Sequence, residues 1–356
     1  MVEKSQRIIY IDFIRIISML GVILLHVSAV PLRDKIGTSS WHIANLLTTI
    51  ATPAVPLFFM ISGALLLHSR RTADLKYVWR HRILKLFMPF LLWSIIAILV
   101  YGRYKHTLTP QSFWQAIVAM PNVPTAEALW FMYPMFVLYI LSPILRQAIT
   151  ALSQKMLQYF LLIWLITNSV LPTIATYVPQ NYKVAFNFNS YWALVGGYLG
   201  YFVLGYYLRT YGLTKLKKWH LCLINCLLVL LVTLETYGAS LQMHQYNDHF
   251  KDYVQSLPIL FLSVGIFLLW QKVDFNLSAR TQHHIRSLAQ LSYGVYLIHN
   301  LIVLVITDPL YTWWHLPITL QLSLNFVIAT TLSLSIIWII TKIPIVRFLL
   351  AGEYDR

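Results

Sequence analysis

Charged residues are scarce in this chain. They make up 11% of its 356 residues, whereas hydrophobic residues make up 58%, and the mean hydropathy is +0.65. Soluble domains carry about 25% charged residues, so this composition excludes an ordinary soluble globular protein. The sequence therefore predicts a polytopic integral membrane protein.

Cysteine and the common ligand motifs are equally sparse. The two cysteines, Cys222 and Cys226, lie one helical turn apart in a single apolar run, which excludes a disulfide framework. The sequence has no glycine-rich phosphate loop and no spacing typical of metal ligands, because the adjacent pair His283 and His284 has no carboxylate or cysteine cluster nearby. We therefore expect no metal.

Negative charge is scarce as well, and the formal net charge is +15. A nucleic-acid-binding protein gathers basic residues on one soluble face, but here Lys and Arg fall between apolar runs. We therefore expect no nucleic-acid partner and read the positive charge as a signal of membrane topology.

Ten apolar runs of about 20 residues predict an all-α bundle of about ten transmembrane helices, forming one domain over 1–356. The expected spans are 8–30, 42–68, 83–101, 126–146, 155–177, 191–209, 219–239, 255–272, 290–308 and 316–340.

The basic residues predict which side of the membrane each loop faces. With the N-terminus inside, twenty of the 27 Lys and Arg residues fall on the cytoplasmic side and six fall outside. This asymmetry predicts that both termini are cytoplasmic. The outer loops are too short to form a domain, so any chemistry must occur within the helical bundle.

Arg15 and His26 lie inside the first apolar run. An ionisable side chain at the bilayer centre costs roughly 2.5 to 3.5 kcal/mol, so such residues usually mark a functional site. Eleven residues make about three helical turns, which places both on one stripe together with Asp12. Arginine suits binding of phosphate or carboxylate, and histidine suits proton transfer. Alternatively, Asp12 and Arg15 form a structural pair and His26 bonds a carbonyl.

Other segments contain weaker candidates. His299 follows the polar and aromatic run Ser292–Tyr296 in the ninth expected span, and a buried histidine is more often structural than catalytic. Glu127 lies at the outer start of the fourth span, where it could simply be solvated. Ser62 precedes a glycine in the second span, downstream of two prolines that free backbone groups.

Taken together, these segments resemble the membrane acyltransferase-3 family, whose members O-acylate surface glycans. The matching elements are Asp12, Arg15 and His26; the run 55–63; Arg80, Arg82, Lys85 and Pro89; Leu129-Trp130-Phe131; and the run 292–299. One position departs from the family pattern. Ala128 stands where members often carry a histidine. The chain is most similar to stand-alone members such as the O-acetyltransferases of enterobacterial common antigen.

The resemblance implies a multi-pass protein of a bacterial plasma or inner membrane that moves an acetyl group from cytosolic acetyl-coenzyme A to a glycan or lipid-linked glycan. It implies Arg15 and His26 as principal functional residues. The resulting hypothesis assigns catalytic roles to His26, Arg15, His299 and Ser62. It assigns substrate binding to Asp12, Glu127, Trp130 and Tyr296, and coenzyme binding to Arg80, Arg82 and Lys85.

Two alternatives stay open from the residues alone. Proline-broken spans with charges at mid-membrane depth are also typical of transporters, although paired halves are not evident here. A membrane protein that binds or senses a ligand without turnover is the second alternative.

Overall fold

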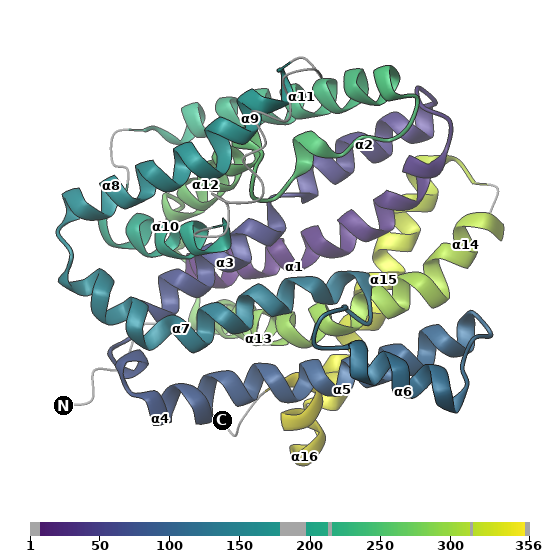
Figure 1. Cartoon of the computed structure of the whole chain (residues 1–356), viewed down its shortest axis with the longest axis horizontal. Coiled ribbons are helices and arrows are strands. Elements are labelled where there is room, and N and C mark those ends of the chain that lie inside the picture. Colours follow the sequence, from purple (N-terminus) through teal and green to yellow (C-terminus); the bar gives the residue numbers. More distant parts are fainter. Residues whose placement is uncertain (1–7, 179–196, 213–215, 314–315, 353–356) are drawn as a thin grey trace.

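A computed structural model describes residues 8–178, 197–212, 216–313 and 316–352, and these residues form helices without strands (Figure 1). Eight helical segments among them are long and apolar enough to cross a membrane. They are Ile9–Arg33, Ser39–Leu66, Leu75–Tyr104, Glu127–Ala151, Gln154–Ala175, Lys218–Met243, Ala279–Trp313 and Ile318–Ile340. The structure thus confirms a polytopic all-helical membrane protein.

Two further expected spans coincide with shorter helices. α12 covers Leu257–Gln271, and α10 covers Gly197–Tyr211. The first part of the expected span 191–209, residues 191–196, lies outside the described residues. The described helices therefore follow the expected order of spans along the chain.

Some helices begin before the expected spans, because the helix is longer than its apolar stretch. α13 begins at Ala279, eleven residues before the expected start at 290, with the Ser278 side chain capping its first turn. Its first residues are polar, and hydropathy detects only the apolar part of a helix. For the same reason the segment expected from 83 begins at Leu75, in its basic stretch.

α1 (Ile9–Ala29) lies at the centre of the bundle and packs against α2, α3, α13 and α15. Its Ile14 and Ile23 side chains have no exposed surface. A 3₁₀ turn, Val30–Arg33, continues it. This position places the polar residues of α1 inside the protein. We call the end of the bundle where α1 begins the near end, and the end where it finishes the far end.

The second span is broken in its middle. α2 (Ser39–Ala51) ends at Ala51 with Thr52 as its C-cap, and α3 (Ala54–Leu66) begins after Pro53. Proline has no backbone N–H to continue the helical bonding, and here the Thr52 hydroxyl donates to the Thr48 carbonyl. The break therefore leaves the first backbone amides of α3 without helical acceptors.

α3 and α10 touch backbone to backbone. A Cβ added to Gly63 would lie 1.7 Å from the Phe202 carbonyl oxygen, and one added to Gly205 would lie 1.9 Å from the Met60 carbonyl oxygen. Only glycine permits so close an approach. Gly63, which drew attention as part of a Ser-Gly pair, therefore serves helix packing.

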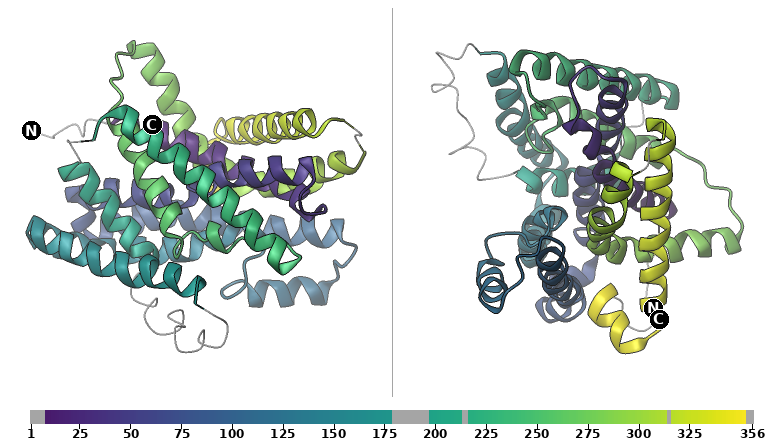
Figure 2. Two further views of the ribbon diagram at one scale, coloured as in Figure 1. Left: turned by 90° about the horizontal axis from the view of Figure 1, so that it is seen from above. Right: turned by 90° about the vertical axis from the view of Figure 1, so that its right-hand side faces the viewer.

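The remaining helices complete the bundle. They are α4 (Leu75–Val78), α5 (Leu84–Tyr104), α6 (Pro110–Ala119), α7 (Met132–Ala151), α8 (Gln154–Leu165), α9 (Leu171–Thr176), α11 (Lys218–Met243), α14 (Asp308–Trp313), α15 (Ile318–Ile340) and α16 (Pro344–Val346). Figure 1 shows α4 toward the left, at the near end, and α6 and α14 toward the right, at the far end. Figure 2 shows from two further sides that α15 flanks the bundle.

Candidate functional site

A cavity of about 2270 Å³ opens at the far end of the bundle. Its walls come from the end of α1 and the following turn, the start of the 3₁₀ turn Glu127–Phe131, the ends of α9 and α11, the loop 244–256, and the second half of α13. Four residues assigned from the sequence line it, namely His26, Glu127, Trp130 and Tyr296. The fold therefore gathers residues from distant parts of the sequence into one hollow.

His26 lies on the cavity wall, in the last turns of α1, and is partly exposed. His299, on α13, is fully buried, and the centroids of the two imidazole rings are 5.2 Å apart. The Nδ1 atom of His299 lies 2.6 Å from the carbonyl oxygen of Tyr296. A carbonyl only accepts, so Nδ1 carries the proton, and in the neutral ring Nε2 of His299 is the unprotonated nitrogen.

Ala128, the position that departs from the family pattern, contributes its backbone to the site. The Tyr296 hydroxyl donates a hydrogen bond to the carbonyl oxygen of Ala128. This bond joins α13 to the 3₁₀ turn that carries Glu127. At position 128 the link between these two elements is therefore made by a backbone carbonyl and not by a side chain.

Glu127 is exposed to the cavity and begins the 3₁₀ turn. Its carboxylate is close enough to interact electrostatically with His26, and it also interacts with Asp308 on α14. A carboxylate near an imidazole stabilises the positive charge that forms when the ring takes up a proton. Glu127 is therefore suited to support proton transfer at His26.

Aromatic side chains form much of the remaining wall. The Trp130 ring stacks on Tyr253 with centroids 5.6 Å apart and an angle of 25° between the planes. The Tyr101 hydroxyl donates to Asn300 Oδ1 at 2.7 Å, which ties α5 to α13 beside the site. The wall thus combines apolar ring surface with hydrogen-bonding groups, as in many small-molecule sites.

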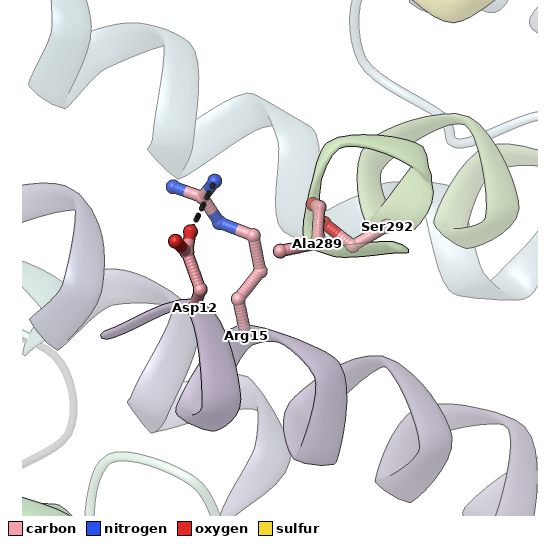
Figure 3. A network of polar contacts seen from close by, with 4 residues as sticks. All are labelled: Asp12, Arg15, Ala289 and Ser292. Carbon is pink, nitrogen blue, oxygen red and sulfur yellow. Dashed lines mark hydrogen bonds and ion pairs between the residues drawn. The ribbon is translucent and has the colours of Figure 1, made fainter. Parts of the chain in front are cut away.

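Arg15 does not line this cavity. Its Nη1 lies 4.0 Å from Asp12 Oδ1, and the side chains are 25% and 3% exposed, respectively. Figure 3 shows the Arg15 guanidinium above the Asp12 carboxylate, with the turn of α13 that contains Ala289 and Ser292 beside the Arg15 stem. The pair of Asp12 and Arg15 that the structural alternative predicts is thus present, and Arg15 lies about 16 Å from His26 along the helix axis.

Besides the buried His299, four other assigned residues do not line the cavity. Ser62 is on α3, past the cavity-lining part of that helix, which includes Val55. Arg80 and Arg82 belong to a π-helical turn at the near end, and Lys85 follows in the first turn of α5. The Arg82 guanidinium lies 5.7 Å from the centre of the Tyr77 ring. The basic stretch is therefore a separate region at the near end.

The structure adds residues that the sequence did not single out. Tyr253 and Lys251 belong to a polar loop with no recognisable motif. Asn300 directly follows His299, so the run 292–299 could have been extended by one residue to find it. Among the described residues no group of three or more His, Cys, Asp or Glu side chains is arranged to hold a metal.

Comparison with known proteins identifies one family. A family model described as an acyltransferase domain matches residues 8–342, which extends from the start of α1 past the end of α15. No curated protein and no solved structure matches the chain.

Proposed function

The chain belongs to this acyltransferase family, and from that premise we propose that it transfers an acetyl group from acetyl-coenzyme A to a hydroxyl group of a surface glycan or its lipid-linked precursor. The protein is a multi-pass membrane acyltransferase. We place it in a bacterial plasma or inner membrane, with the near end toward the cytoplasm and the far end outside.

The observation that carries this proposal is the position of His26 on the wall of the far-end cavity, within electrostatic range of Glu127. His26 removes the proton of the acceptor hydroxyl as that oxygen attacks the thioester carbonyl carbon. The new C–O bond forms and the C–S bond breaks. The thiolate then leaves and takes up the proton from His26, and the negative charge of Glu127 stabilises the intermediate imidazolium.

Backbone amides near the break in the second span are suited to stabilise the oxyanion. Thr52 and Val55 line the cavity, so the start of α3 reaches its wall. The first amides of a helix have no helical acceptor and point outward along the axis. Such fixed donors stabilise negative charge that develops on a carbonyl oxygen. Ser62 lies two turns further along α3 and is the second candidate for this role.

The near end is suited to bind the coenzyme. Arg80, Arg82 and Lys85 follow one another within two helical turns, and guanidinium groups bind phosphate oxygens in a fork. Arg15, between the near end and the cavity, supplies a further positive charge along the path of the thioester arm. We therefore propose that donor and acceptor enter from opposite ends and meet near His26.

Acyl transfer by purified protein tests the proposal. The protein in detergent is given acetyl-coenzyme A with a labelled acetyl group and extracted glycan, and alkali-labile label on the glycan is measured. We expect transfer by the wild type, a loss of about 10² to 10⁴-fold in His26→Ala, and normal transfer in His283→Ala, an exposed control histidine.

The same assay separates the proposal from the transport alternative. A transporter in sealed vesicles accumulates label without forming an ester, whereas an acyltransferase forms ester in detergent, where no compartment exists. Absence of ester from every extracted glycan, or activity of His26→Ala within about threefold of wild type, would reject the assignment.

A further inference from the structure

The loop between α11 and α12, residues 244–256, forms one wall of the cavity but contains none of the residues placed in the chemistry. Side chains fasten it at several points. Asp252 Oδ1 accepts hydrogen bonds from the backbone amides of Val254 at 2.8 Å and Gln255 at 2.6 Å. The Val254 carbonyl in turn accepts from Ser169, which adds a bond to the neighbouring span.

Lys251 fixes the other side of the same loop. Its side chain is buried, and Nζ donates to the carbonyl oxygen and Oδ1 of Asn45 at 3.0 and 2.6 Å and to Thr48 Oγ1 at 2.7 Å. Asn45 and Thr48 belong to α2, so these bonds hold the loop against the bundle. Tyr253 lies between two anchored stretches and is presented to the cavity at a fixed position.

Tyr253 lines the cavity from this loop. Its ring stacks on Trp130, and both residues line the same cavity as His26. Burial first, and then the carboxylates of Asp248 and Glu127, raise the pKa of Tyr253. Its hydroxyl therefore stays protonated and can donate a hydrogen bond. An aromatic face with a neighbouring donor suits a ring that has apolar C–H edges and hydroxyl groups.

The charges of the cavity wall bear on what can bind there. Six carboxylate residues line it: Asp34, Glu127, Glu235, Asp248, Asp252 and Asp308. Four basic residues accompany them: Arg33, Lys35, Lys105 and Lys251. Acidic residues thus outnumber basic ones, and a hollow lined by an excess of negative charge repels anions.

We propose that Tyr253, stacked on Trp130, is a specificity-determining residue that binds the acceptor ring, and that this subsite selects rings without negative charge. The proposal rests on the proposed function, because that function makes the bound ring an acceptor. Its test is nevertheless a binding measurement, so that it can fail or succeed independently of acyl transfer.

Binding of three matched sugars by the purified full-length protein tests the proposal. The probes are a methyl glucoside, which is neutral, a methyl glucosaminide, which is cationic, and a methyl glucuronide, which is anionic. Saturation-transfer NMR in detergent gives their Kd values. We expect the first two to bind in the millimolar range and the glucuronide about tenfold more weakly.

Substitutions locate the binding. Tyr253→Ala is expected to weaken glucoside binding about tenfold, whereas Tyr253→Phe, which retains the stacked ring, keeps most of it. Tyr104→Ala is the matched control, because Tyr104 is an exposed tyrosine at the far end of α5 that does not line the cavity. Equal melting temperatures of the variants exclude a loss of fold as the cause.

Three results would each overturn the proposal: no binding of the neutral sugar, a Kd of Tyr253→Ala within twofold of wild type, or equal affinity for the glucuronide and the glucoside. If acyl transfer is absent while Tyr253-dependent sugar binding is present, the proposed function fails and the subsite stands. If transfer is present and binding does not depend on Tyr253, only the subsite fails.

Discussion

His26 and His299 lie side by side with ring centroids 5.2 Å apart, although one belongs to α1 and the other to α13. The bond from His299 Nδ1 to the Tyr296 carbonyl fixes the tautomer of His299. Its Nε2 is buried and has no hydrogen-bond partner among the described residues. This lone pair becomes an acceptor for a ring N–H of His26 when the His26 ring turns toward it, and such a bond determines which nitrogen of His26 faces the substrate.

Replacing His299 by asparagine separates this positioning role from a structural one. The amide nitrogen introduced by His299→Asn would be close to the position of Nδ1 and can still donate to the Tyr296 carbonyl, but the variant has no acceptor in place of Nε2. We expect kcat to fall about 10²-fold, since misplacement of a base costs this much, while KM and melting temperature stay near wild type. His283→Asn is the control. A kcat within about threefold of wild type, or a parallel loss of stability, contradicts the positioning role.

The basic stretch at the near end is predicted to bind the coenzyme phosphates. Arg82→Gln should raise KM for acetyl-coenzyme A about tenfold with little change in kcat, because one charge-assisted hydrogen bond is worth roughly 1.5 to 3 kcal/mol before solvent screening. Initial rates of ester formation measure this. Arg103→Gln is the control, because Arg103 lies in the last turn of the same segment, at the far end. Equal KM changes in both variants would contradict a phosphate site at the near end.

The order and the approximate places of the helices could be predicted from the sequence because a membrane span must be apolar over about 20 residues. Helix starts could not, since polar turns such as the one after Ser278 extend a helix without changing its hydropathy. The sequence pointed to His26, which lines the cavity, and to its neighbour His299, because both are ionisable residues within an apolar run. An ionisable side chain within the membrane costs free energy, so it usually belongs to a functional site.

The rest of the site depends on tertiary contacts. Tyr253 and Lys251 lie in an ordinary polar loop, and only folding brings that loop against Trp130 and α2. The sequence also did not show that Arg15 lies outside the cavity. Arg15 and His26 belong to one continuous helix, α1, but the sequence does not reveal where along that helix the cavity ends.

The contact between α3 and α10 predicts a strong effect of one methyl group. Gly63→Ala places a Cβ 1.7 Å from the Phe202 carbonyl oxygen, so the helices must separate and the melting temperature must fall. Gly238→Ala is the control, because a Cβ there meets nothing within 4 Å and alanine is the better helix former by roughly 0.5 to 1 kcal/mol. Thermal unfolding in detergent measures both. A Gly63→Ala protein as stable as Gly238→Ala contradicts the contact.

Lys251 makes the stability of the protein depend on pH. Burial lowers the pKa of Lys251 from 10.5 to about 7, against the attraction of Asp248. Between these two pH values the unfolded chain holds a proton that the folded protein has lost. The contribution of Lys251 to the free energy of unfolding therefore rises with pH, by up to about 1.4 kcal/mol per pH unit, and is constant below about pH 7.

Substitution by methionine isolates this contribution. Lys251→Met removes the hydrogen-bond donor of Asn45 and Thr48, and its side chain has no proton to release at any pH. The difference in melting temperature between wild type and Lys251→Met should therefore widen in favour of the wild type as pH rises above 7. Lys105→Met, at an exposed lysine of the same cavity, should show no such widening. A difference between wild type and Lys251→Met that stays constant across this range means that the folded protein keeps the Lys251 proton, and the fastening of the loop 244–256 is then independent of pH.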